Sequence, residues 1–334
     1  YTMIRIAIFY TGLVRTLQST IPYIVEFLNK ENYQNNYEFG FFCSLQSSSF
    51  EEQWSVNQLL YANFGNKIKN ISWINKENEN WINLSNSLIK NIDINDYWKS
   101  YLQSSGSMIE YYQMYNSYIN MKSYERENNI NYNFVLRLRT DVILKDEINF
   151  DFQSFTPNFI KEHLIKAQNL LNKNTFVNNE VFEYFMNTFM INSRKIYDKT
   201  QLFISPIHKN SFINLTQNNN YNEEEYVYAL YNYIQNCDYL ISLRNNVVYF
   251  GKASLFEKIH KLGVTYGSYK IAEEPTYWFN AECQLTGICR ENNIDYYSSV
   301  TELEGNSLYS YNETNYFTDN KLNNSSYSFF IKRI

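Results

Sequence analysis

The stretch Tyr132-Asn133-Phe134-Val135-Leu136-Arg137-Leu138-Arg139-Thr140-Asp141 decides the fold of this chain. Its apolar residues predict a strand over residues 133–139, followed directly by Thr140 and Asp141. Asp141 is therefore expected just outside the carboxyl end of a central strand, which is where open α/β sheets bind their ligands. This makes Asp141 the most informative single position in the sequence.

Upstream of this strand, predicted strands and helices alternate. Residues 4–10 form a nearly continuous apolar run, which is typical of a strand buried on both faces. Further strands are predicted over residues 37–44 and 67–74, with a helix over residues 51–64 that Gly65 closes. Such alternation predicts right-handed crossovers and a mostly parallel sheet. The expected fold class is α/β, with a mostly parallel central sheet flanked by helices.

Two of the helices have recognisable beginnings. Thr20 is expected to cap a helix that has Pro22 in its first turn. The sequence Ser107-Met108-Ile109-Glu110 is a capping box, which predicts the start of a second helix. The apolar face expected on that second helix consists of Met108, Tyr112, Tyr115 and Ile119.

The expected domain organisation follows from where this pattern loosens. Residues 3–300 are expected to form one domain, within which residues 152–246 are an inserted, largely helical region on the acceptor side. Residues 301–334 are rich in Asn, Ser and Tyr and suit a C-terminal wrap or lid. The other elements expected in this half are strands over residues 201–205 and 247–251 and helices over residues 255–262 and 280–292.

Composition and charge exclude several classes of protein. The chain has 334 residues, of which 44% are hydrophobic and 19% charged, as in a globular protein. With 29 Lys+Arg against 34 Asp+Glu its net charge is −5, so it lacks the basic footprint of a nucleic-acid binder. No apolar run is long enough for a membrane span or a signal peptide, and the four cysteines form no C-x-x-C pair. We therefore expect a cytoplasmic protein with no nucleic-acid partner.

The residues able to carry chemistry lie at predicted strand ends. Arg137 and Arg139 alternate with leucines, so both guanidinium groups are expected on one side of the strand, where they suit bidentate binding of phosphate. Asp141 suits a divalent cation that neutralises a departing diphosphate. The alternative is that Arg139 and Asp141 form a structural ion pair at the sheet edge.

A loop, Thr11-Gly12-Leu13-Val14-Arg15, follows the first strand. A glycine in this position allows a phosphate or ribose to approach the backbone closely, although a lone glycine after a strand is more often simply a turn. The sequence contains neither a G-x-G-x-x-G pattern nor a Walker pattern, which argues against dehydrogenases and P-loop kinases.

Five segments occur in an order that carries a further resemblance. They are Thr11-Gly12-Leu13-Val14-Arg15-Thr16, Ser107-Met108-Ile109-Glu110-Tyr111-Tyr112, the strand from Tyr132 to Asp141, Tyr249-Phe250-Gly251, and Trp278-Phe279-Asn280-Ala281-Glu282-Cys283-Gln284-Leu285. Over about two thirds of the chain, this order resembles the GT-A type glycosyltransferase-like proteins of bacterial surface-polysaccharide loci and large DNA viruses. In a viral member the compartment would be the host cytoplasm.

The resemblance implies a GT-A-like, Rossmann-related sheet and a hexosyltransferase-type reaction. A monosaccharide would move from a nucleoside diphosphate sugar, with a UDP-sugar favoured, to a hydroxyl group on a glycan or protein. Asp141 would hold Mn²⁺ or Mg²⁺, although Arg139 stands where the Asp-x-Asp motif of this fold has its first aspartate. The residues implied to bind the nucleotide-sugar are Thr11, Gly12, Arg15, Ser107, Tyr112, Arg137 and Arg139.

An inverting transferase also needs a carboxylate that accepts the proton of the acceptor hydroxyl. Glu282, early in the predicted helix over residues 280–292, is the first candidate, and Glu274 is the next. Two other functions stay open. The replacement of the first aspartate by Arg139 would suit a catalytically inert relative that binds nucleotide-sugar or glycan. The third choice is a nucleotidyltransferase, which usually has a glycine-rich and basic loop after its first strand.

Overall fold

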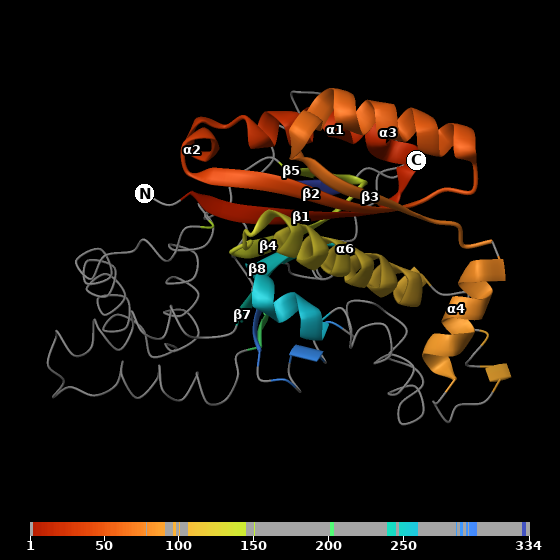
Figure 1. Ribbon diagram of the computed structural model, residues 1–334. Coiled ribbons are helices and arrows are strands. Elements are labelled where there is room, and N and C mark those ends of the chain that lie inside the picture. The colour runs from red at the N-terminus through yellow and green to blue at the C-terminus, as the bar shows by residue number, and fades with distance from the viewer. Residues whose placement is uncertain are drawn as a thin grey trace, which may run out of the picture.

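The computed structural model describes residues 3–77, 79–90, 96–97, 100, 106–144, 150, 201–203, 239–244, 247–259, 285, 288–289, 292, 294–298 and 329–331. Within these residues the chain forms an eight-stranded, mostly parallel mixed sheet with helices on both faces (Figure 1). This arrangement has the α/β character that the alternating pattern predicts.

The sheet places the N-terminal strand β1 near its middle. Its strands, in spatial order, are β3 (Ile68–Ile74), β2 (Tyr37–Gln46), β1 (Ile4–Leu13), β4 (Phe134–Arg139), β8 (Val248–Lys252), β7 (Tyr239–Arg244), β9 (Asp295–Ser298) and β6 (Gln201–Phe203). The first four are mutually parallel, whereas β8 runs antiparallel to both β4 and β7. The chain moves outward from β1 through β2 to β3 and then returns to the other side of β1 with β4. The direction of strand addition therefore reverses between β1 and β4.

Alternate side chains of the central strands enter two separate helical layers. Phe41 of β2 stacks on Phe64, the last residue of α3 (Phe50–Phe64), with 4.4 Å between ring centroids. Its neighbour Phe42 packs into the cluster on the opposite face, beneath α6 (Gly106–Asn128). Figure 1 shows α1 (Leu17–Leu28) and α3 on one side of the sheet and α6 on the other. Residues 6–10 of β1 have no exposed surface, which confirms that this strand is buried on both faces.

The face that α6 turns toward the sheet differs from the expected one. Tyr111, Met114 and Met121 are wholly buried, whereas Ile119 is 44% exposed. The expectation of a face running from Met108 to Ile119 is therefore wrong. Tyrosines occur all round this helix, so the apolar pattern alone does not select a face, and packing against β1, β2 and β3 selects it instead.

The helix α1 begins earlier than predicted. It starts at Leu17, directly after a 3₁₀ turn over Val14–Thr16, so Thr20 lies inside the helix and is not its cap. The buried hydroxyl of Thr20 donates a 2.8 Å hydrogen bond to the carbonyl of Thr140. Pro22 is consequently inside the helix and not in its first turn. The hydroxyl of Thr20 thus links α1 to the end of β4.

The boundaries of the other helices are nearer to the prediction. The hydroxyl of Ser49 accepts a 3.3 Å hydrogen bond from the backbone N–H of Glu52 and caps α3. Gly65, with φ of +53°, ends α3 as predicted. Helix α6 begins at Gly106, so Ser107 lies in its first turn and is not the residue before it.

A second, smaller sheet lies beside α1. It consists of β5 (Val142–Leu144), which follows Asp141 directly, and β10 (Phe329–Ile331), paired antiparallel. The remaining described elements are α2 (Glu31–Gln34), α4 (Glu79–Ile89) and 3₁₀ turns over Gly65–Lys67 and Ala253–Leu255. Strands β6 and β7 come from the range predicted as an insertion, and residues 256–259, 285 and 288–289 are helical. The rest of residues 152–246 and 301–334 lies outside the described residues.

Candidate functional site

The carboxyl ends of β1 and β4 are joined through Thr140. The backbone N–H of Thr140 donates to the carbonyl of Thr11 at 3.0 Å, and its hydroxyl donates to the carbonyl of Leu13 at 2.6 Å. The carbonyl of Thr140 in turn accepts from the hydroxyl of Thr20. Strand β1 continues through Leu13, so Thr11, Gly12 and Leu13 belong to the strand and not, as predicted, to a loop after it. The hydrogen bonds of Thr140 hold the carboxyl end of β1 against the end of β4, so the residues on either side of Thr140 have defined positions.

A cavity of about 280 Å³ opens at these strand ends. Its lining comes from the end of β1 and the 3₁₀ turn after it, the ends of β2 and β4, the start of α6, and Lys76 beyond β3. The ionisable side chains among its lining residues are Arg15, Lys76, Arg137, Arg139, Glu110 and Asp141. Four cations thus face two carboxylates, although the whole chain has a net charge of −5. The cavity therefore favours an anionic ligand.

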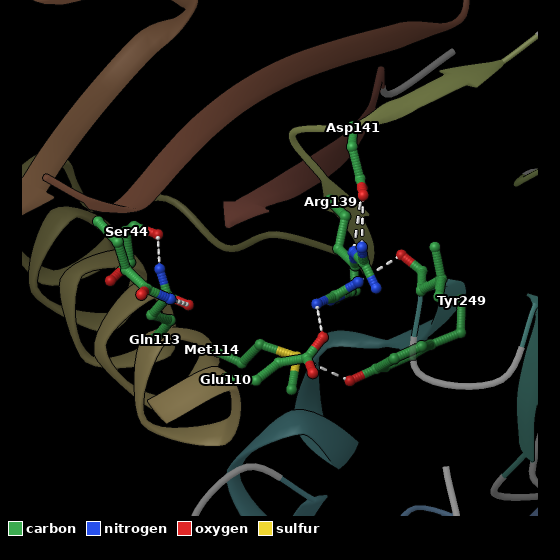
Figure 2. Close-up of polar contacts among 10 residues, drawn as sticks. Ser44, Glu110, Gln113, Met114, Arg139, Asp141 and Tyr249 are labelled. Atoms are coloured by element: carbon green, nitrogen blue, oxygen red, sulfur yellow. Dashed lines mark hydrogen bonds and ion pairs between the residues drawn. The ribbon is translucent and has the colours of Figure 1, made fainter. Parts of the chain in front are cut away.

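At the carboxyl end of β4, Arg139 and Asp141 form an ion pair with two hydrogen bonds. The Nε of Arg139 donates to Oδ1 of Asp141 at 3.0 Å, and the terminal nitrogen Nη2 donates to Oδ2. Figure 2 shows the two side chains pointing toward one another at the strand end. The alternative of an Arg139–Asp141 ion pair at the sheet edge is what the structure contains. Asp141 is about a tenth exposed and Arg139 about a quarter exposed.

Arg137 lies deeper on the same side of β4 and has no exposed surface. Its guanidinium donates to the carboxylate of Glu110 on α6 and to the carbonyl of Val247. Burial lowers the pKa of Arg137, and the carboxylate of Glu110 opposes that shift. The predicted placement of both arginines on one side is confirmed, because both line the cavity. Arg137 nevertheless acts mainly as a buried support for that wall.

Two hydrogen-bonded glutamine side chains line the cavity on the side of β2. Gln113 of α6 donates to the carbonyl of Ser44 at 2.7 Å and accepts from the side chain of Gln46 at 2.9 Å. Gln113 is almost wholly buried, and Figure 2 shows it extending from α6 toward Ser44. The two glutamines therefore link the first turns of α6 to the end of β2.

The structure separates some of the residues that the sequence groups together. Thr11 is wholly buried and does not line the cavity, although it pairs with Arg139 in the β1–β4 register. Tyr112 faces a neighbouring groove with Trp73 and Trp81, where its ring centroid lies 5.6 Å from that of Trp81. Burial raises the pKa of Tyr112.

The other predicted site residues have these positions. Gly12, Arg15, Arg137, Arg139 and Asp141 all line the cavity. Ser107 is in the first turn of α6, but its side chain lies outside the described residues, as do Glu274 and Glu282.

Several cavity residues were not identified from the sequence. In the sequence Glu110 stands out only as part of a capping box, and no motif contains Lys76, Gln46 or Gln113. A polar pair at positions 110 and 113, three residues apart in a helix that follows the strands of an α/β sheet, was the available signal. Lys76 has no local signal, because only the course of β3 brings it to this edge.

A divalent cation at Asp141 does not fit the residues that surround it. Both carboxylate oxygens are bonded to Arg139, whose guanidinium already places positive charge beside them. The other carboxylate of the cavity, Glu110, is paired with Arg137. Within the part of the chain that the structure describes, no three His, Cys, Asp or Glu side chains form a group suited to a metal ion.

Comparisons with known proteins leave the family open. The sequence matches no protein-family model, and no curated protein matches it. The GT-A resemblance therefore stays a prediction from the order of motifs. Among the helices of the described ranges, none combines the length and apolar character needed to cross a membrane.

Proposed function

We propose that this protein transfers a monosaccharide from a nucleoside diphosphate sugar to a hydroxyl group on a glycan or protein. The observation that carries the proposal is the cationic cavity at the carboxyl ends of β1 and β4, at the point where the direction of strand addition reverses. In Rossmann-related sheets this switch point is where nucleotides bind. An excess of positive charge there suits a diphosphate.

The GT-A assignment is part of the same proposal. Four parallel strands in the order β3-β2-β1-β4, with α1 and α3 on one face and α6 on the other, agree with a Rossmann-related half-sheet. The motifs around Gly12 and Asp141, which carry the family resemblance, flank one cavity. A fold alone does not specify a reaction, so the charge of the cavity supports the activity more than the topology does.

The reaction assigns separate tasks to the residues present. The acceptor oxygen forms a bond to the anomeric carbon, while the bond from that carbon to the β-phosphate oxygen breaks and its electron pair stays on the phosphate. Arg15 and Arg139, which both line the cavity, are proposed to neutralise the departing diphosphate. If the reaction inverts configuration, Glu282 is proposed as the base that takes the hydroxyl proton, with Glu274 as the next candidate.

A panel of nucleotide-sugars tests the proposal. The donor is expected to raise the apparent unfolding free energy by about 2.7 kcal/mol at 100 times its Kd, and the free nucleoside should stabilise much less. Turnover is measured as release of nucleoside diphosphate with a mixture of glycan acceptors. If none of the UDP-, GDP- and dTDP-sugars stabilises the protein or yields free nucleoside diphosphate, the proposed function is contradicted.

A second candidate is a protein that binds nucleotide-sugar without turning it over. It is favoured because Arg139 stands where the Asp-x-Asp motif has its first aspartate and forms an ion pair with Asp141. Stabilisation by a nucleotide-sugar with no released diphosphate, under conditions that saturate binding, would select this candidate. Release of pyrophosphate from a nucleoside triphosphate would instead indicate a nucleotidyltransferase.

A further inference from the structure

Arg139 stands at the sequence position of the first aspartate in the Asp-x-Asp motif, and it lines the cavity. Arg139 is the last residue of β4, and in the β1–β4 register it pairs with Thr11, the residue before Gly12. It lines the cavity with about a quarter of its side chain exposed. The guanidinium group of Arg139 is thus present at the carboxyl end of β4 without any added ion.

Asp141 determines where that charge sits. Its two oxygens bond Nε and Nη2 of the same guanidinium, so the planar group is fixed in orientation as well as in position. Asp141 follows β4 directly, and its neighbour Thr140 is fixed to β1 by backbone and hydroxyl bonds. The ion pair therefore stands at the joined ends of β1 and β4, two neighbouring strands in the interior of the sheet, which gives it little freedom to move.

The cavity has further positive charge beyond this pair. Arg15 and Lys76 also line it, so its ionisable side chains sum to an excess of two positive charges. Arg15 is exposed and lies in the 3₁₀ turn after β1. A diphosphate entering this cavity meets Arg15 and Lys76 at its rim and Arg139 at the strand end.

We infer that Arg139, oriented by Asp141, binds the diphosphate of the donor in place of a divalent cation, so that nucleoside diphosphates bind this protein without metal. This inference deepens the proposed function and rests on it for the identity of the ligand. Arg139 contacts the diphosphate, and Asp141 is a positioning residue that acts through Arg139. When the anomeric bond breaks, the added negative charge on the β-phosphate is stabilised by the guanidinium.

Calorimetry with inorganic pyrophosphate tests this without knowledge of the sugar or base. The wild-type full-length chain is expected to bind pyrophosphate in EDTA, and Mn²⁺ should not tighten that binding. Affinity that is tenfold or more weaker in EDTA than in Mn²⁺, or no binding in either buffer, would overturn the inference. This arm needs no variant, so it does not depend on whether a substitution folds.

Substitutions then test which arginine binds pyrophosphate. Arg139→Ala should weaken pyrophosphate binding in EDTA by roughly 10- to 100-fold, as expected for the loss of hydrogen bonds to a charged group. Arg5→Ala is the matched control. Arg5 forms an ion pair with Glu38 on the same sheet, but at the amino ends of β1 and β2, away from the cavity. Arg5→Ala should change the affinity by less than twofold. Equal effects of the two substitutions would contradict the assignment.

Two further variants separate orientation from charge. Asp141→Asn should weaken binding in the wild type but cause no further loss in Arg139→Ala, because Asp141 acts only through Arg139. Additive losses would contradict that dependence. Arg139→Asp, which restores Asp-x-Asp, should bind pyrophosphate only when Mn²⁺ is present, and failure of Mn²⁺ to restore binding would contradict the substitution of guanidinium for metal.

These outcomes are distinguishable from failure of the proposed function. Metal-free pyrophosphate binding with no transfer from any nucleotide-sugar would leave Arg139 as the diphosphate contact of a non-catalytic protein. Sugar transfer that strictly requires Mn²⁺ would uphold the activity and overturn the role of Arg139.

Discussion

The hydroxyl of Thr140 lies 2.6 Å from the position that a Cβ on Gly12 would occupy. Gly12 also has a φ of +134°, a backbone conformation that residues with side chains rarely adopt. The sequence suggested that this glycine opens space for a phosphate or ribose. The structure shows that its missing side chain also makes room for Thr140, so Gly12 allows β1 and β4 to meet at the edge of the cavity that it lines.

Substitution of Gly12 should therefore affect folding before ligand binding. Gly12→Ala combines backbone strain of about 1–3 kcal/mol with a clash that costs a further 1–3 kcal/mol or so. Gly65→Ala is the control, because Gly65 also has positive φ but its Cβ would meet nothing within 4 Å. Denaturant unfolding should show a larger loss for Gly12→Ala than for Gly65→Ala. Equal losses would mean that Thr140 moves aside without cost.

The buried ion pair of Arg137 and Glu110 should contribute much more to the free energy of unfolding than an exposed ion pair does. Glu110→Gln leaves the guanidinium of Arg137 without its counter-charge and without solvent, which typically costs about 3–5 kcal/mol. Glu38→Gln removes the partner of Arg5, where both side chains are more than a third exposed, and should cost no more than about 1 kcal/mol. Chemical denaturation of both variants measures the difference, and similar small losses would show that Arg137 finds another acceptor.

Arg15 should contribute to binding and little to stability. It is exposed at the rim of the cavity, so Arg15→Ala is expected to change the unfolding free energy by less than about 0.5 kcal/mol. It should weaken UDP binding several-fold while leaving uridine binding unchanged, because only UDP carries phosphate. Arg126→Ala, an exposed arginine in the last turn of α6, is the control. Equal weakening of UDP and uridine would place Arg15 away from the phosphates.

Glu282→Gln tests the base that the sequence proposes. The amide is nearly isosteric but does not accept a proton, so kcat should fall by about 10² to 10⁴ while donor affinity barely changes. The acid limb of the pH profile should disappear as well, because that limb reports protonation of the base. Glu274→Gln is made in parallel. A Glu282→Gln variant with normal rate and an intact acid limb would move the assignment to Glu274 or to a retaining mechanism.

Local patterns in the sequence are sufficient to predict the central strands of the fold and the residues that β4 contributes to the site. The apolar run over residues 4–10 and the alternating residues of β4 predict buried strands, because strand formation and burial depend on neighbours in the chain. The same reasoning places Asp141 beyond the end of β4 and puts Arg137 and Arg139 on one side. These predictions need only the period of a strand and the knowledge that parallel strands end at one edge.

Tertiary structure decided what each of these groups contacts. The sequence allows Asp141 to be a metal ligand or the partner of Arg139, and only the side-chain geometry shows that it is paired with Arg139. Glu110 reaches Arg137, and Lys76 reaches the cavity, because α6 crosses the sheet and β3 ends beside β2. Packing against the sheet likewise determines which face of α6 is buried, because tyrosines occur all round the helix. Such contacts join segments far apart in the chain, so local periodicity contains no information about them.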